Sequence, residues 1–480
     1  MRSSWKSLVA AAVGLVALPQ FAAADEVQEQ LQQMQERMSQ LEEKLAATTD
    51  QLEDSKRKVD EQQKTIERVG LEDRSAASGI ASFFESVEFG GWVSASYWWN
   101  TNEPVDGANL VAPGVGLAGG GPNTGTFGTA NTFNPDHNTF QLDQLWFEMA
   151  KPATAESRGG FGADIVMGKT ADLLTGSSMQ YLTSGLGVPN VQSNGNDVAV
   201  FQAYAEYLAP LGPGLNIRAG RYATHIGAEV PQTTHNFNIS RSLVWSILQP
   251  VNDVGVWSSM ELENGFVLGA GVVNSTYSNL NTDFDNDKSY QYKLGFSQEG
   301  WGIAYNGQYG RVGVSPAAGG SSAKVGINNV VLTWDPSENL ATWVDITHVW
   351  LNDGSGAAGN ANPWTGVGGN PWAAGIALAG RLAITEATGF GVRGEYLYGN
   401  RNFFVTPANG AVTGIGDQQL WSITGTLDHH LTEALMMRGE VRYEQGLQNA
   451  GSDRAFYFKG GGSGVQKSQI LLGADMVYSF

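Results

Sequence analysis

The sequence predicts an all-β transmembrane barrel of about 16 antiparallel strands, preceded by an N-terminal α-helical coiled coil. Apolar residues follow a 4-3 spacing in residues 27–69, and from Val87 onward they alternate with polar residues in period two. The intervals between the alternating segments are long and short in turn. We therefore expect a signal peptide (1–24), a coiled coil (25–69), a linker (70–86) and a barrel (87–480).

The first 24 residues have the three parts of a secretory signal. Arg2 and Lys6 form a charged start, LVAAAVGLVAL is an apolar core, and AAA at 22–24 supplies the small residues of a cleavage site. The apolar core is shorter than the roughly 20 residues that a membrane helix needs. An N-terminal anchor that stays uncleaved is the alternative.

The composition excludes several classes of function. The chain has no cysteine, so it forms no disulfide and uses no thiol chemistry. Its net charge of −19 argues against nucleic acid and anionic lipid headgroups as partners. After the signal, no apolar run is long enough for a helical span. The 62 Gly, 14 Trp, 15 Tyr and 20 Phe residues fit a chain of many strands and turns.

The 4-3 spacing in residues 27–69 is the seam of a coiled coil. The remaining positions are charged and rich in glutamine, so a single helix would gain little stability by itself. We therefore expect self-association, although a helix packed on its own barrel is the alternative. The seam residues expected to carry the contact are Leu31, Met38, Leu41, Leu45, Leu52, Val59 and Ile66.

The alternation after residue 87 predicts sixteen strands, most of them near the ten residues that a tilted membrane strand requires. The gaps after odd-numbered strands are long, whereas those after even-numbered strands are as short as EN and QE. This pattern indicates periplasmic turns and external loops. The expected strands are 87–99, 140–149, 160–169, 198–208, 215–223, 253–262, 265–274, 289–297, 300–310, 327–335, 340–350, 375–385, 389–398, 418–428, 434–444 and 469–480.

Several strands alternate an apolar face with a face that carries charges of both signs. A packed core cannot hold these charges together, but a wide, water-filled lumen can. The charged residues expected to face inward are Arg218, Arg393, Glu395, Arg438, Glu440 and Arg442. Aromatic residues near the strand ends fit interfacial girdles: Tyr97, Trp99, Tyr207, Trp334, Trp350, Tyr398, Tyr443 and Tyr478.

The stretch FQAYAEYLAPLGPGLNIRAGRYATHIGAEV (201–230) and NISRSLVW (238–245) resemble the OmpL-like β-barrel porin family. DVGVW (253–257) and LGAGVVNS (268–275) continue the similarity, which covers roughly 87–480 and is specific in 198–275. The resemblance implies an outer-membrane porin. The coiled coil departs from the family's core pattern and is similar to the N-terminal extensions of trimeric sugar porins.

Residues 224–252 form the third long loop and include the unusually apolar ISRSLVWSILQP. The third loop of general porins folds into the barrel, so we expect this loop to form the constriction. Glu229, Arg241, His225 and His235 would line or brace the narrowest zone, facing the inward charges of the wall. Opposed acidic and basic rows would orient polar solutes. The alternative is that these charges pair with one another and stiffen the wall.

Other motifs give no sign of a cofactor, a metal site or an enzyme. GVGLAG (114–119) matches G-x-G-x-x-G but lies in a Gly-rich loop with no βαβ unit. DFDNDKSYQYKL (283–294) begins like a calcium loop, yet Lys288 and Leu294 stand where Gly and Glu are required. No G-x-S-x-G elbow is present. A Ser-His pair from distant strands, as in a barrel lipid hydrolase, is an alternative.

The chain ends on the alternating strand SQILLGADMVYSF, with Phe480 as its last residue. In a closed barrel this strand pairs with both the fifteenth strand and the first. Phe480 resembles the C-terminal aromatic by which the barrel-assembly machinery recognises outer-membrane barrels.

The expected function is passive diffusion of small hydrophilic solutes or ions across the bacterial outer membrane, without enzymatic activity. The N-terminal region would lie in the periplasm. Membrane lipid and further copies of the chain in a homotrimer are the expected partners, with peptidoglycan as a further candidate. A structural envelope tether, with the barrel as its anchor, is the alternative of a different class, and a barrel lipid hydrolase is the second alternative.

Overall fold

The structure is a computed structural model that describes residues 86–103, 133–134, 137–175, 198–276, 287–311, 324–352, 370–400, 403, 417–448, 457–458 and 465–480. The chain divides into two compact units, 1–85 and 86–480, and all described residues belong to the second. The expected signal peptide and coiled coil lie outside the described residues, as does the expected linker except for Ser86.

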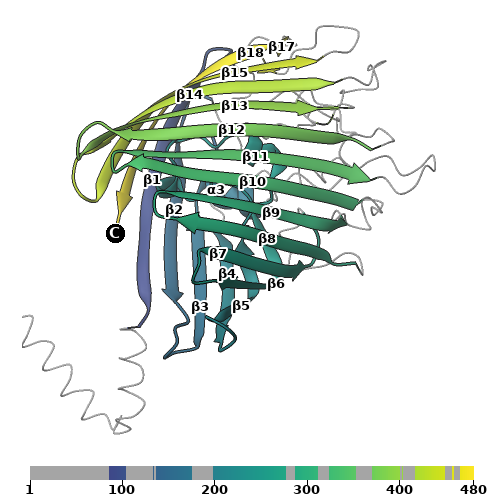
Figure 1. The fold of residues 1–480 in the computed structure, drawn as a ribbon. Coiled ribbons are helices and arrows are strands. Elements are labelled where there is room, and N and C mark those ends of the chain that lie inside the picture. The colour runs from purple at the N-terminus through teal and green to yellow at the C-terminus, as the bar shows by residue number, and fades with distance from the viewer. Residues whose placement is uncertain are drawn as a thin grey trace, which may run out of the picture. The chain divides into compact units, whose positions relative to one another are not determined.

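Sixteen strands form one closed antiparallel barrel, which confirms the predicted fold class and strand number (Figure 1). Neighbours in sequence are neighbours in the wall, and β18 lies between β15 and β1. The strands are β1 (Glu88–Asn100), β2 (Thr139–Lys151), β3 (Gly159–Met167), β4 (Val198–Ala209), β5 (Leu215–Ala223), β6 (Asn252–Glu261), β7 (Phe266–Val273), β8 (Ser289–Gln298), β9 (Trp301–Arg311), β10 (Lys324–Ser337), β11 (Leu340–Asn352), β12 (Trp372–Ala383), β13 (Thr388–Gly399), β14 (Gln418–His430), β15 (Leu435–Gln448) and β18 (Ser468–Ser479).

Short elements lie between the strands. They are the helices α3 (Lys169–Thr175) and α4 (Leu243–Leu248), the 3-10 helix η4 (Thr233–His235), and a small hairpin of β16 (Tyr457–Phe458) and β17 (Val465–Gln466). The alternation pattern predicted none of these. Among the described residues, no helix has the length and apolar character needed to cross a bilayer.

The two faces of the wall differ as the alternation predicts. On β13 the outward Phe390, Val392 and Tyr396 are 41–42% exposed, whereas the inward Arg393 and Glu395 are buried. A closed ladder leaves no unpaired strand edge in lipid, so an apolar outer face is sufficient for the wall to sit in a membrane. The eight aromatic residues predicted for the girdles occupy outward positions near the strand ends.

The C-terminal strand closes the barrel as predicted. β18 pairs with β15 through Leu435↔Tyr478 and with β1 through Trp92↔Ser479. Phe480 then donates its N–H to the carbonyl of Gly91 at 2.9 Å and accepts the N–H of Gly91 at 3.1 Å. The ring of Phe480 lies against Gly91, where a Cβ atom would come within 2.8 Å of it. The last residue is therefore part of the seam.

Deleting Phe480 should lower the folded fraction of the barrel, because both backbone hydrogen bonds to Gly91 and the covering ring are lost. At about 1 kcal/mol for each of the two hydrogen bonds, we expect roughly a thirtyfold shift in the folding equilibrium. The measurement is the fraction of heat-modifiable barrel on unboiled gels across a urea series. Phe480→Ala, which keeps the backbone bonds, should be affected less. Equal folding of the deletion variant and the natural chain would contradict this account of the closure.

Candidate functional site

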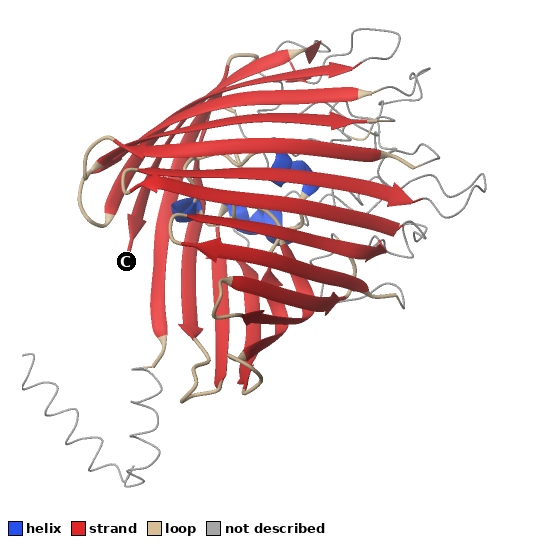
Figure 2. Ribbon diagram, viewed as in Figure 1, coloured by secondary structure: helices blue, strands red, loops and turns tan. Residues whose placement is uncertain are grey.

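The connection between β5 and β6, residues 224–251, lies inside the barrel and is here named the inserted segment. Figure 2 shows short helices enclosed by the strands. Its hydrogen bonds, described below, run to inward-facing side chains on β2, β10, β11 and β13–β15. α4 begins after Ser242, whose hydroxyl accepts the N–H of Trp245 at 3.0 Å. Pro250 follows the helix and cannot continue its hydrogen bonding.

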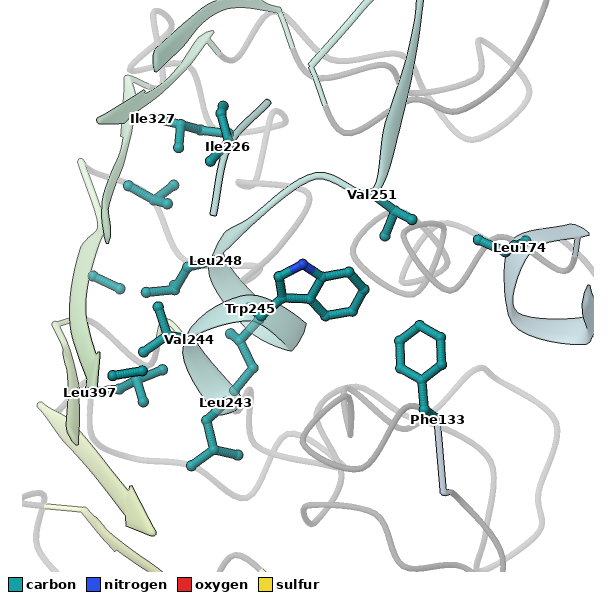
Figure 3. Close-up of a cluster of buried hydrophobic side chains, with 14 of the residues drawn as sticks. Phe133, Leu174, Ile226, Leu243, Val244, Trp245, Leu248, Val251, Ile327 and Leu397 are labelled. Carbon is teal, nitrogen blue, oxygen red and sulfur yellow. The ribbon is translucent and has the colours of Figure 1, made fainter. Parts of the chain in front are cut away.

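One face of α4 packs on the inner wall of β11–β14. Leu243, Val244 and Leu248 are buried in one cluster with residues of these strands (Figure 3). Burying each such side chain contributes about 1.5–3 kcal/mol. The inward residues of β12 from 373 to 379 are all Ala or Gly, and a Cβ atom at Gly375 would lie 2.9 Å from Val244 and 3.2 Å from Leu248. Gly375 therefore lets α4 approach the wall closely.

The opposite face of α4 is covered by parts of two other connections. The ring of Trp245 lies 5.2 Å from that of Phe133, which belongs to the connection between β1 and β2. Leu174 of α3 belongs to the same buried cluster, and Figure 3 shows Phe133 and Leu174 on the Trp245 side of the helix. Parts of three loops thus meet inside the barrel around an apolar centre.

Carboxylates of the wall bind backbone N–H groups of the inserted segment. Glu440 on β15 accepts from the N–H groups of Ile239 (2.7 Å) and Ser240 (3.3 Å). Glu395 on β13 accepts from those of Leu243 and Val244 in the first turn of α4. These N–H groups have no partner within the helix, so the carboxylates satisfy donors that would otherwise be buried unpaired.

A third carboxylate that accepts backbone N–H groups, Glu229, belongs to the inserted segment itself. Glu229 accepts the N–H of Ser242 at 2.7 Å and is buried. It also forms an ion pair with Arg393 of β13, at 2.7 Å between Nη1 and Oε1. Glu229 therefore joins two parts of the segment to each other and to the wall.

Arginines of the wall bind carbonyl groups of the same segment. Arg393 donates to the carbonyl of Ser240 at 2.7 Å, and Arg442 to that of Arg241 at 2.6 Å. Arg438 donates to the carbonyl of Thr233 at 3.1 Å and pairs with Asp475 of β18. Each of these arginines also has a carboxylate partner. The wall therefore binds both kinds of backbone group of the segment: its carboxylates bind the N–H groups, and its arginines bind the carbonyl groups.

Arg442 lies between two carboxylates of the wall. It lies 3.3 Å from Glu395 and 2.5 Å from Glu444, and all three side chains are fully buried. Truncating one partner of such a buried pair is typically destabilising by about 3–5 kcal/mol, because the other charge is left in an apolar interior. These pairs fix the guanidinium of Arg442, which in turn donates to the carbonyl of Arg241 in the inserted segment.

Arg241 binds the segment to itself. Its guanidinium donates to the carbonyls of Val230 (2.7 Å), Pro231 (2.6 Å) and Ile239 (2.6 Å). It also lies over the ring of Phe133 at 5.0 Å. Burial lowers the pKa of Arg241 to about 10, although Glu229 opposes the effect. Arg241 is still charged at neutral pH and closes residues 230–241 into a compact loop.

The two ends of the inserted segment are fixed to other parts of the wall. The N–H of Gly227 donates to Asn329 of β10 at 3.1 Å, and that of Ala228 to Asp345 of β11 at 2.9 Å. Gln249 donates to the same Asp345. On another side of the barrel, the N–H of Thr233 donates to Gln144 of β2 at 3.2 Å. The segment therefore spans the lumen.

The sequence-predicted charged residues fall into two groups. Seven are buried where the inserted segment meets the wall: Glu229, Arg241, Arg393, Glu395, Arg438, Glu440 and Arg442. Charges expected to face each other across water are here in direct contact. Arg218 lies apart, on β5, where it pairs with Glu206 at 3.2 Å and has a side chain 40% exposed.

The two histidines near the segment also differ. His225 stacks on Trp257 of β6, at 4.1 Å between ring centroids. Burial, and to a lesser extent the charge of Lys293, lowers its pKa to about 3, so it is neutral in the physiological range. His235 is exposed and meets the ring of Trp92 edge-on at 6.0 Å.

Several residues that position the segment were missed at the sequence level. Asn329, Asp345 and Asp475 occupy inward positions of predicted strands, so the alternation could have identified them as facing the lumen. Phe133 and α3 lie in loops without periodicity, and no sequence signal identifies their contacts. Among the described residues, no group of three or more His, Asp or Glu side chains could hold a metal ion.

A closed antiparallel barrel with an apolar outside, a polar inside and a loop fixed in its lumen defines the class of outer-membrane porins. The sequence model of one family, described as "Putative beta-barrel porin-2, OmpL-like", matches residues 86–480. The chain belongs to this family, and the resemblance seen in the sequence is confirmed. It is an outer-membrane porin that allows passive diffusion.

Solved structures with a similar fold include three outer-membrane proteins, each overlapping 82% of this chain. A loop L8 deletion mutant of OmpT of Vibrio cholerae has 10% identity, 99% of its own chain covered and a TM-score of 0.48. The channel DcaP of Acinetobacter baumannii has 11% identity, 97% of its own chain covered and a TM-score of 0.46. An anion-selective porin from Comamonas acidovorans has 10% identity, 99% of its own chain covered and a TM-score of 0.48. No curated protein matches this chain.

Gly375→Val should displace α4 from the wall, because the added methyl groups would overlap Val244 and Leu248. Overpacking of this kind typically destabilises by about 1–3 kcal/mol. We expect a changed single-channel conductance and a lower urea midpoint. Gly394→Val is the matched control, because its Cβ position on β13 has no neighbour within 4 Å. If both variants behave alike, the close contact of α4 with β12 does not fix the segment.

Proposed function

We propose that the inserted segment, residues 224–251, is the constriction of this porin and sets the size of the hydrophilic solutes and ions that pass. The observation that carries the proposal is the buried ion pair of Glu229 with Arg393, together with the many buried hydrogen bonds between the segment and the wall. A loop held in the lumen by so many directional contacts gives the channel a fixed cross-section. The proposed transport is diffusion down a gradient, with no reaction, so the protein is not an enzyme.

The seven buried charged residues brace the constriction in this proposal. They are Glu229, Arg241, Arg393, Glu395, Arg438, Glu440 and Arg442. Five of them form ion pairs with close partners, whereas Arg241 and Glu440 are satisfied by hydrogen bonds to backbone and hydroxyl groups. The exposed or half-buried part of the segment includes the uncharged Thr234, Asn236 and Phe237 beside His235. Ion preference then depends on inward charges of the wall that are partly exposed, such as Arg218 and Lys293. We therefore expect the preference for ions of one charge over the other to be weak.

The proposal extends to assembly. The chain forms a homotrimer, and the predicted coiled coil joins the copies on the periplasmic side, within reach of peptidoglycan. The C-terminal strand with Phe480 is the segment read by the barrel-assembly machinery. The anchoring of β18 between β15 and β1 supports this last role, because barrel closure depends on that strand.

Planar-bilayer recording with Arg241→Ala tests the proposal. The substitution removes the guanidinium that donates to the carbonyls of Val230, Pro231 and Ile239, although Asn236 and Gln144 still donate to the first two. Residues 230–241 should therefore loosen, and the single-channel conductance should change, with more frequent current fluctuations. Arg311→Ala is the control, because Arg311 pairs with Asp287 at the end of β9, away from the inserted segment. Stepwise conductance in the natural chain is expected.

Three outcomes would contradict this assignment. A folded natural chain that shows no conductance would favour an envelope tether over a porin. Conductance unchanged by Arg241→Ala, as by the control, would mean that the inserted segment does not limit flow. Lipid hydrolysis in detergent, abolished by changing one serine, would favour an enzyme.

A further inference from the structure

Two inward carboxylates of the wall lie next to each other on β2 and β3. Glu148 of β2 is directly opposite Asp164 of β3 in the strand register. Side chains at such opposed positions have Cβ atoms about 4.5–5.5 Å apart, and like charges placed there are destabilising. Asp164 is buried, and Glu148 is half-buried. The pair therefore needs a positive charge between its members, either a metal ion or a shared proton.

No arginine or lysine of the described wall supplies this charge. Elsewhere on the wall, inward carboxylates pair with arginines, as on β13, β14, β15 and β18. Among the described residues, neither Glu148 nor Asp164 forms an ion pair, and Arg218 of the nearby β5 is bound to Glu206 of β4. His235 of η4 lies close enough to influence the charge of Glu148, but no ion pair joins the two.

A third oxygen belongs to the same place. Gln232 of the inserted segment is buried, and its side-chain amide interacts with the carboxylate of Asp164. Its Oε1 atom has no hydrogen-bond partner among the described residues. The two ends of a glutamine amide have nearly the same shape, so a half-turn about the last bond presents this oxygen to Asp164. Gln202 of β4 donates to Oδ2 of Asp164 at 2.9 Å and holds the carboxylate in position.

A metal ion satisfies these three side chains better than a shared proton does. A proton between the two carboxylates would leave the amide oxygen of Gln232 buried without a partner, which is unfavourable. Hard cations bind carboxylate and amide oxygens, and two carboxylates balance the charge of a divalent ion. Ca²⁺ takes about six to eight oxygen ligands in a flexible arrangement. Water from the lumen can complete such a shell beside the half-buried Glu148.

We propose that Glu148, Asp164 and Gln232 bind a divalent cation such as Ca²⁺ between the wall and the inserted segment. The ion has the role that arginines have on β13 and β15: it neutralises inward carboxylates and holds the segment to the wall. The site consists of two acidic side chains and one amide. It therefore differs from a cluster of three acidic or histidine ligands, which the described residues do not contain.

Terbium binding tests the site, because Tb³⁺ replaces Ca²⁺ at oxygen ligands and its emission is excited through a neighbouring tryptophan. Trp146 of β2 interacts with Asp164 and is therefore close enough. The purified full-length protein is freed of metal with a chelator and titrated with Tb³⁺, then with Ca²⁺. The variants are Asp164→Asn and Glu148→Gln, which keep the shape of each side chain. Asp428→Asn is the matched control, because Asp428 is an inward carboxylate that already pairs with Arg381.

We expect a saturable terbium signal in the natural chain that Ca²⁺ removes. Each variant should bind at least tenfold more weakly, because losing even a residue that only orients a metal ligand typically costs about 10–100-fold in affinity. The control should match the natural chain, since the acidic loops are the same in all four proteins. Heat-modifiability on unboiled gels verifies that each barrel is folded. If both variants bind terbium as the natural chain does, the proposed site is wrong.

The same proteins in planar bilayers distinguish a metal ion from a proton and from a failure of the porin itself. Adding Ca²⁺ to chelator-treated protein in a KCl gradient should shift the reversal potential toward that of chloride. The shift should be larger in the natural chain and the control than in the two variants. A reversal potential that responds to pH but not to Ca²⁺ would mean that the pair shares a proton, and would overturn the proposal. Stepwise conductance without terbium binding would remove the cation site and leave the channel function standing.

Discussion

The contact on which the rest of the structure depends is that between Glu440 of β15 and the backbone of the inserted segment. One carboxylate receives the N–H groups of Ile239 and Ser240, the hydroxyl of Ser240 and the hydroxyl of Thr426 at 2.7 Å. Charge-assisted hydrogen bonds are about twice as strong as neutral ones, and this one is buried where water cannot replace it. Together with the packing of α4 on the inner wall, such contacts give a loop of this length one preferred place in the lumen.

The strand alternation makes this contact possible. A strand that faces lipid on one side presents every second residue to the lumen, so β13 and β15 each bring a row of charges to the same wall. Water in an open lumen would solvate those charges separately. The inserted segment instead covers them, and its backbone N–H and carbonyl groups form hydrogen bonds with the charged side chains. The wall thus holds the segment, and the segment neutralises the wall.

The sequence was sufficient for the barrel and for the identity of the inserted loop, but not for its contacts. Period-two alternation and the alternation of gap lengths predicted the sixteen strands, and β5 was predicted residue for residue. Apolar residues in a long loop indicated that 224–252 folds inward. The pairing of charged side chains could not be predicted in this way, because Arg393 and Glu229 are 164 positions apart and meet only when the barrel has closed. Asp345 was overlooked although its inward position follows from the same alternation. The role of Phe133 depends on the path of another loop, which has no periodic signal.

The most direct test of the central claim is the size limit of solute entry when the buried carboxylates are removed. In liposome swelling with neutral sugars of increasing size, the Glu395→Ala, Glu440→Ala double variant should admit larger sugars than the natural protein, because residues 239–244 lose their acceptors on the wall. Heat-modifiability on unboiled gels verifies that the barrel is folded. An unchanged size limit in a folded double variant would contradict the claim that this buried contact sets the width of the channel.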